Sequence, residues 1–380
     1  MADRDHLSWI SSETSRRAKS AVAVALSFII LLGGMGFASW KGYGLYMDWI
    51  QKDDYIGSGD DPITVVIKRG DGWGKVADTL MANDVIRDPS LFEREALALS
   101  DGPQPGTWNI FTHLPAKTAA AMLNDPKNQV KITLTIPEGR RLADVYSILI
   151  KTVPLTQDQI DQAVAAVQAD PTVIGLNPAA GTNMEGFLFP ATYDLYPPLN
   201  TDALSIFSLM AARFNQIAEE IDLGAGAEAL GLNAQQVVVV ASIIEGEVTN
   251  DEDRAKVARA IYNRLNDGMP LQSEAAFRYG RLMADGTPYN DDITTASQQD
   301  ASLPYNYYIH PGLPPTPIDN PGRDSLEAAL NPADGDWLYW VTVNLDTGLT
   351  KFTADEKEFW EFVDELDQWC ADNGSPTGCP

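Results

Sequence analysis

The stretch Val237–Val248, VVVVASIIEGEV, is apolar until two acidic residues, Glu245 and Glu247, appear near its end. Directly before it, Asn233 followed by Gln236 is typical of a helix N-cap with a capping box. The valines favour a strand by local propensity, but the apolar run is long enough for a helix. We therefore predict a buried helix that carries two carboxylates at its C-terminal end.

Two interpretations of these carboxylates are open at this point. Acidic side chains are almost never fully buried unless they are paired, so both could simply lie in solvent. Alternatively, one of them lies in an apolar wall and transfers protons. Residues two apart on a helix point about 200° apart, so Glu245 and Glu247 cannot both face one cleft. This excludes the simplest glycosidase, in which two carboxylates flank one bond, and leaves a single acid acting on a substrate that supplies its own nucleophile.

The N-terminal region predicts a membrane anchor. Residues 20–40 carry no charge, and as a helix they would be about 30 Å long, which spans a bilayer core. Arg16, Arg17 and Lys19 precede them, so the positive-inside rule keeps the N-terminus in the cytoplasm and places the rest outside. A cleaved signal peptide is the alternative, but the apolar run is longer than a typical signal core. We expect a single-pass protein of the cell membrane with an extracytoplasmic body.

Composition limits the partners and cofactors. The net charge of -26 argues against nucleic-acid binding, which needs a basic surface. The histidines, His6, His113 and His310, are scattered without metal-ligand spacing, so we predict no metal and no cofactor. The two cysteines, Cys370 and Cys379, lie in a Gly/Pro-rich tail, and outside the cell we expect them to form a disulfide.

A weak internal repeat follows the predicted anchor. Residues 63–80 and 132–149 each read as an alternating strand, a turn glycine and an amphipathic helix. The fold class is therefore α+β: a transmembrane helix, a small α/β module, and a mixed helical catalytic domain with a few strands. The predicted segments are a cytoplasmic tail at 1–19, the transmembrane helix at 20–40, a linker at 41–61, the module at 62–153, the catalytic domain at 154–365 and a C-terminal tail at 366–380.

Several motifs occur in a fixed order along residues 63–363. They are EGFLFPATY at 185–193, VVASIIEGE at 239–247, IYNRL at 261–265, GMPLQSE at 268–274, YNYY at 305–308 and GLPPTPIDNPG at 312–322. In this combination they resemble the MltG-type endolytic murein transglycosylases, also called YceG-like proteins. The resemblance implies a LysM-like module and a single N-terminal anchor.

The resemblance also implies a function and its residues. The family cleaves peptidoglycan between N-acetylmuramic acid and N-acetylglucosamine and leaves 1,6-anhydromuramyl ends, which would terminate nascent glycan strands. Its catalytic acid is the second glutamate of the E-x-E motif, which corresponds to Glu247. We expect Glu245 to play a supporting part. The residues expected to contact or support the substrate are Gln272, Glu274, Tyr305, Asn306, Tyr308 and Asn320.

The sequence departs from the family pattern at three positions. Gly246 replaces the lysine between the two glutamates, Glu274 replaces an aspartate, and Phe359 replaces a late histidine. Two alternatives stay open: a lysozyme-like hydrolase that uses Glu247 with Glu274, and a non-catalytic, membrane-anchored glycan-binding protein. The expected partners are peptidoglycan glycan strands and, as candidates, membrane-bound peptidoglycan synthases.

Overall fold

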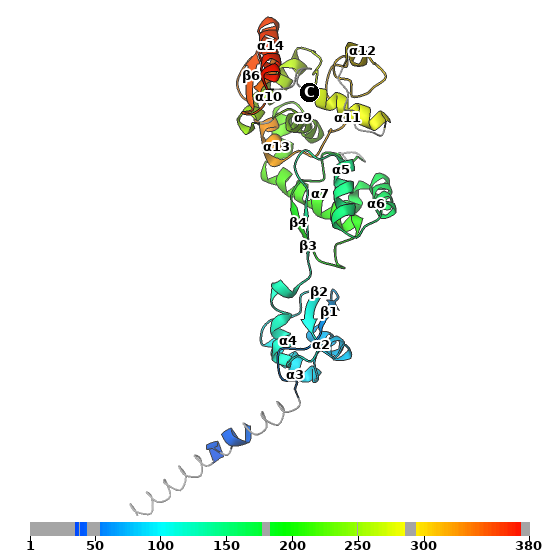
Figure 1. The fold of residues 1–380 in the computed structure, drawn as a ribbon, viewed down its shortest axis with the longest axis vertical. Helices are drawn as coiled ribbons and strands as arrows, with labels where there is room; N and C mark the ends of the chain where they lie inside the picture. Colours follow the sequence, from blue (N-terminus) through cyan, green and yellow to red (C-terminus); the bar gives the residue numbers. More distant parts are fainter. Residues whose placement is uncertain are drawn as a thin grey trace, which may run out of the picture. The chain divides into compact units, whose positions relative to one another are not determined.

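The computed structural model describes residues 35–37, 39–43, 54–176, 183–248, 250–285 and 294–373. The predicted cytoplasmic tail and most of the predicted transmembrane segment lie outside these ranges. Within the described ranges, no single helix has both the length and the hydropathy needed to cross a membrane. The chain forms two compact units, Met1–Val130 and Lys131–Pro380, and its secondary structure confirms the α+β class (Figure 1).

The first unit is a small layer of helices on a two-stranded antiparallel sheet. Its strands pair from Pro62 opposite Phe111 to Ile67 opposite Gly106. Alternate residues of the first strand point inward and join Trp73, Phe92 and Trp108 in a separate core. Its elements are β1 (Pro62–Ile67), α2 (Trp73–Ala82), α3 (Pro89–Leu97), β2 (Gly106–Phe111), α4 (Ala116–Met122) and the short 3-10 helix η1 (Pro126–Asn128).

The second unit is mostly helical and carries two small antiparallel sheets, β3–β4 and β5–β6. The elements of its first half are β3 (Ile132–Thr135), α5 (Leu142–Thr152), α6 (Gln157–Ala169), η2 (Pro171–Ile174), β4 (Thr192–Leu195), α7 (Ala203–Glu220) and α8 (Leu223–Ala229). Those of its second half are α9 (Ala234–Glu247), η4 (Asp251–Asp253), α10 (Arg254–Asn266), α11 (Glu274–Asp285), α12 (Thr295–Gln298), α13 (Arg323–Leu330), β5 (Tyr339–Asn344), β6 (Leu349–Thr353) and α14 (Glu356–Asp372).

Helix α9 is the helix predicted from the opening stretch, and it forms the centre of the second unit. The Asn233 side chain accepts a hydrogen bond from the Gln236 backbone N–H at 2.9 Å, and the Gln236 side chain accepts one from the Asn233 N–H at 2.9 Å. This confirms the predicted capping box. Residues Val237–Ile244 are all buried, as expected for a core helix that is apolar on every side. Helices α8, α10, α11 and α13 pack around it.

The structure divides the chain at Val130/Lys131, and not at 153/154 as the sequence predicted. The second copy of the repeat does form β3 and α5, but β3 pairs with β4. Leu134, Val145 and Leu149 are fully buried in the core of the second unit. A repeat in sequence predicts a repeated local structure, but it does not determine which core buries the apolar face of each copy.

The C-terminal end is also more ordered than predicted. Helix α14 continues to Asp372, so the first part of the predicted tail at 366–380 is helical. Cys370 is buried on this helix. Cys379 lies outside the described residues, and the disulfide stays a prediction.

Candidate active site

The carboxyl group of Glu247 lies where the end of α9 meets the start of α11. Its Oε1 accepts a hydrogen bond from the Ser273 hydroxyl at 2.8 Å, and the backbone N–H of Ala275 donates to the same carboxyl group. The Ser273 hydroxyl in turn accepts from the Ala276 N–H at 3.1 Å and so caps α11. The acid is thereby fixed at the positive end of a helix dipole.

Burial dominates the acidity of Glu247. Removal of the carboxyl group from water raises its pKa, since desolvation penalises the charged form. The hydrogen bonds from Ser273 and Ala275 oppose this rise because they stabilise the carboxylate, and the nearby negative charge of Glu274 adds to it. An acid balanced in this way can hold a proton and can also accept one back after giving it up.

Glu247 opens into a polar cavity of about 390 Å³. A half-buried carboxyl group with a raised pKa beside a polar cavity is the arrangement that general acid catalysis requires. The described residues that line the cavity are Gly139, Arg141, Gly246, Glu247, Glu274, Ala275, Arg278, Ile318 and Asp319.

Glu245 lies in different surroundings. Its Oε2 accepts hydrogen bonds from the Ser325 hydroxyl at 2.7 Å, from the Gly322 N–H at 3.1 Å and from Arg254 Nη1 at 3.2 Å. The side chains of Glu245 and Arg254 are only 9% and 11% exposed. This carboxylate therefore ties α9 to the beginnings of α10 and α13, as a supporting residue would.

Two of the amides predicted to contact substrate bond within the protein. Asn320 is fully buried; its Oδ1 accepts from the Gly186 and Leu188 N–H groups at 3.1 and 3.0 Å, and its Nδ2 donates to the Arg140 carbonyl at 2.8 Å. Asn306 is also fully buried, and its Nδ2 donates to two carbonyls of residues 298 and 300 at 2.9 Å each. Neither amide lines the cavity. Both hold loops in place.

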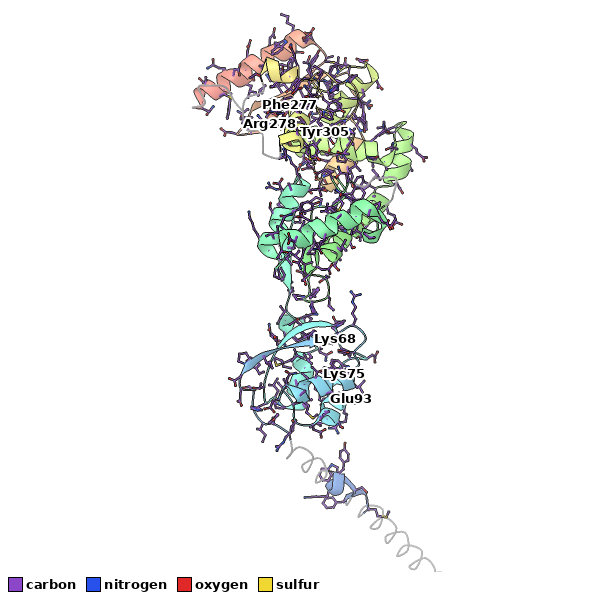
Figure 2. All side chains as sticks on the ribbon, turned by 90° about the vertical axis from the view of Figure 1, so that its right-hand side faces the viewer. Lys68, Lys75, Glu93, Phe277, Arg278 and Tyr305 are labelled. Atoms are coloured by element: carbon purple, nitrogen blue, oxygen red, sulfur yellow. The ribbon has the colours of Figure 1, made fainter. Side chains whose placement is uncertain are left out.

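The two predicted tyrosines pack against α11; Tyr305 is labelled in Figure 2, together with Phe277 and Arg278 of α11. The ring centroids of Tyr305 and Tyr279 are 5.0 Å apart. The Tyr305 hydroxyl forms a hydrogen bond with the Thr316 hydroxyl at 2.6 Å. Tyr308 lies edge-on to Phe277 at 5.8 Å. Burial, reinforced by the negative charges of Glu274 and Glu247, raises the pKa of Tyr308 to about 12. Tyr308 is therefore a neutral hydroxyl group that is electrostatically coupled to the acids of the cavity.

The last two predicted residues flank Ser273. Gln272 is exposed, has a left-handed backbone with φ of 52°, and donates its N–H to the Tyr307 carbonyl at 2.7 Å. Glu274 lines the cavity, and its Oε1 accepts from Arg278 Nε at 2.6 Å. Gln272 does not line the cavity. The structure thus brings only Glu274 to the same cavity as Glu247.

Sequence reasoning missed four polar residues of this region. Ser273 bonds the acid directly, and Asp319, Arg141 and Arg278 line the cavity. Ser273 and Asp319 lie within the quoted motifs, but a serine before a helix or an aspartate before Asn320 gives no signal of its own. Phe359, one of the departures, lies on α14 with its ring 5.1 Å from that of Tyr339, and it does not line the cavity.

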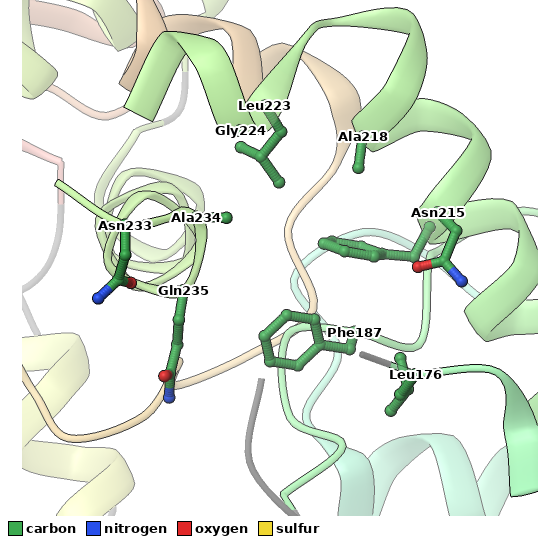
Figure 3. Close-up of a pocket in the computed structure, with 10 residues that line it drawn as sticks. Leu176, Phe187, Asn215, Ala218, Leu223, Gly224, Asn233, Ala234 and Gln235 are labelled. Carbon is green, nitrogen blue, oxygen red and sulfur yellow. The ribbon is translucent and has the colours of Figure 1, made fainter. Parts of the chain in front are cut away.

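A second cavity of about 320 Å³ lies at the other end of α9 (Figure 3). Phe187 and Leu176 face the first residues of α9, Ala234 and Gln235, across it. Its described lining residues include no ionisable side chain. This cavity therefore offers no acid for proton transfer among its described lining residues.

Known proteins resemble this chain over most of its length. The family model described as YceG-like family matches residues 65–365 of the chain. An endolytic murein transglycosylase of Streptococcus pneumoniae is 27% identical over 345 residues, which is 84% of this chain and 61% of that protein. An endolytic murein transglycosylase of Bacillus subtilis is 27% identical over 310 residues, which is 78% of this chain and 82% of that protein.

A solved structure is also similar to this chain. The crystal structure of a YceG-like protein from Listeria monocytogenes is similar with a TM-score of 0.51 and 25% sequence identity. The match covers 80% of this chain and 99% of that one. The chain thus matches the Listeria protein over nearly its whole length, whereas it spans only 61% of the streptococcal relative.

Proposed function

Because the chain belongs to the YceG-like family, we propose that it is an endolytic lytic transglycosylase of peptidoglycan with Glu247 as its catalytic acid. The substrate bond joins N-acetylmuramic acid to N-acetylglucosamine, and the product is a 1,6-anhydromuramyl end that terminates a glycan strand. The names of its relatives support this activity, since those from Streptococcus and Bacillus are endolytic murein transglycosylases.

The observation that carries the proposal is the position of Glu247. It is the acid of α9 whose pKa is raised by burial and that lines the polar cavity. Glu245 is instead occupied by Arg254, Ser325 and the Gly322 N–H. One acid with a proton to give, and no second carboxylate on the same helix face, suits a reaction in which the substrate provides the nucleophile.

The reaction needs one residue in two roles. Protonated Glu247 donates its proton to the glycosidic oxygen as the bond from that oxygen to C1 of the muramyl residue breaks. The resulting carboxylate, stabilised by Ser273 and the Ala275 N–H, then takes the proton from the muramyl 6-hydroxyl. The 6-oxygen closes on C1 and forms the anhydro ring. No water is consumed, and Glu247 ends the cycle protonated.

The test compares two variants, Glu247→Gln and Glu245→Gln. Glu247→Gln should lower production of anhydro-muropeptides from purified peptidoglycan by about 10²–10⁴-fold, measured by mass spectrometry of the products. Glu245→Gln should retain chemistry in whatever fraction of the protein stays folded, with folding checked by circular dichroism. Near-normal product from folded Glu247→Gln would refute the assignment of the acid.

A lysozyme-like hydrolase is the second candidate, favoured by the single fact that Glu274 lines the same cavity as Glu247. In that reaction Glu274 would act as the second carboxylate and water would enter. The product would then have a reducing end. Mass spectrometry separates the two products by the mass of one water molecule, so the same digest decides between them.

The first unit and the N-terminus complete the proposal. We propose that the first unit is a LysM-like module; its order β1–α2–α3–β2 and its antiparallel sheet support this.

Residues 20–40 would anchor the chain in the cell membrane near membrane-bound glycan synthases, which are candidate partners. A secreted form that begins near Asp60 should cut isolated peptidoglycan but fail to substitute in cells. Full rescue at equal abundance would count against the tether.

A further inference from the structure

Asp319 is a buried carboxyl group that the proposed proton transfer does not use. Asp319 is only 5% exposed, yet it lines the cavity that contains Glu247. No described group lies within hydrogen-bond distance of its Oδ1. An unpaired buried carboxyl group is costly, so a folded protein that keeps one at its active cavity needs a reason for it.

The backbone fixes this side chain from both sides. The N–H of Ile318 donates to the Ser242 hydroxyl at 3.1 Å, and Ser242 belongs to α9. The N–H of Asn320 donates to the Arg140 carbonyl at 3.1 Å. Asp319 is therefore held between two anchored neighbours, and its side chain position is determined before any ligand arrives.

Two glycines leave the space beside the carboxyl group open. A Cβ atom placed on Gly246 would lie 3.8 Å from Asp319 Oδ2, and one on Gly139 would lie 4.0 Å from it. Both glycines line the same cavity. Oδ2, and not the buried Oδ1, thus borders the part of the cavity in which a ligand atom can approach the carboxyl group.

Burial and the surrounding charges favour the protonated form of the Asp319 carboxyl group. Burial raises the pKa of Asp319 well above its usual value, and the negative charges of Glu245 and Glu185 raise it further. Arg141 lowers it. Glu247, Glu274 and Arg278 line the same cavity. A protonated carboxyl group is a hydrogen-bond donor as well as an acceptor.

We propose that Asp319 is a substrate-binding residue that donates a hydrogen bond to an uncharged oxygen of the glycan in the cavity of Glu247. This inference rests on the proposed function for the identity of the ligand. The strongest uncharged acceptor on an N-acetylated sugar is the carbonyl oxygen of its acetamido group. Asp319 would thereby position the sugar against Glu247 without taking part in the proton transfer.

The experiment uses the whole protein and uncross-linked glycan strands from purified peptidoglycan. Asp319→Ala should raise KM by about 3- to 10-fold, the loss expected for one hydrogen bond, with kcat nearly unchanged. Asp319→Asn keeps a neutral donor of the same shape, so its KM should stay within about twofold of the original. Asp319→Ala should also raise Tm by about 2–4 °C, because it removes an unpaired buried polar group.

Stability and binding moving in opposite directions is the signature of this role. A lower Tm for Asp319→Ala would indicate a structural role and overturn the proposal, as would an unchanged KM. Loss of kcat in Asp319→Asn would show that the carboxyl group itself takes part in the chemistry, and would also overturn it. If the unmodified protein makes no anhydro product, the proposed function fails instead.

Binding to the inactive Glu247→Gln protein tests Asp319 separately from turnover. Its affinity for the strands should fall as the pH rises and Asp319 loses its proton, since the donor is then lost. The double variant Glu247→Gln/Asp319→Asn should not show this fall. The same pH dependence in both proteins would refute the inference whatever the enzyme does to peptidoglycan.

Discussion

Glu245→Gln should destabilise the second unit strongly, although Glu245 is not the catalytic acid. The change removes the negative charge that pairs with Arg254 at 3.2 Å, in a site where the two side chains are 9% and 11% exposed. Breaking a buried ion pair costs about 3–5 kcal/mol, because the remaining charge stays buried. Glutamine keeps an oxygen that can accept from Ser325 or the Gly322 N–H, and Arg254 keeps its contact with Asp251. We therefore expect the lower end, about 3 kcal/mol.

Urea unfolding followed by circular dichroism measures this loss, and a fall in Tm of about 6–12 °C should accompany it. The matched control is Glu220→Gln, which removes an exposed carboxylate 2.7 Å from Arg323 and should cost less than about 1 kcal/mol. Replacing both partners, in Glu245→Gln/Arg254→Met, should recover part of the loss, since no charge is then left unpaired. Equal effects of Glu245→Gln and Glu220→Gln would show that the buried pair does not hold α9 in place.

Three further outcomes follow from burial and close packing. Burial raises the pKa of Glu185 from 4.5 to about 7, so the folded protein binds this proton more tightly than the unfolded chain. The free energy of unfolding should therefore fall by up to about 3 kcal/mol as the pH rises from about 4.5 to 7. Glu185→Gln should flatten this dependence on pH, as measured by urea unfolding. Gly280→Ala would place a Cβ atom 2.6 Å from Tyr305 Cβ and should cost about 1–2 kcal/mol, whereas Gly224→Ala, with open space around it, should stabilise its helix by up to about 1 kcal/mol; thermal unfolding of both variants compares them. Cleavage of peptidoglycan should slow as the pH rises through the raised pKa of Glu247, because only the protonated acid donates, and a rate that increases over that range would contradict its role.

Local patterns predicted the local structure well. The capping residues and the apolar run defined α9. Strand β6 was missed, because its residues Leu349–Thr353 mix exposed and half-buried positions and give no clean alternation. The structure divides at Val130/Lys131, because a strand-turn-helix pattern does not say which core receives it.

The candidate site shows the same limit of prediction. The helical pitch alone separates Glu245 from Glu247, and the structure gives the two acids different neighbours. The contact between Glu247 and Ser273 joins residues 26 positions apart in sequence, and no periodic pattern encodes such a contact. Asn306 and Asn320 were predicted to bind substrate because they are amides in an irregular loop. Buried amides satisfy loop backbones equally well, and sequence alone does not distinguish the two uses.

The hydrogen bonds of Asn320 join distant parts of the chain and so limit the order in which the second unit can fold. The Asn320 side chain joins the backbone of Arg140 to that of Gly186 and Leu188, across up to 180 residues of chain. The Glu245 carboxylate likewise accepts hydrogen bonds from Gly322 and Ser325, which come much later in the chain. A growing polypeptide therefore cannot complete the cavity until almost the whole second unit has been synthesised, since contacts so distant in sequence form late. Shortened chains that stop before residue 320 would contain Glu247 and Ser273 but lack Asn320 and the partners of Glu245. An interrupted synthesis should therefore not release a fragment with the proposed activity.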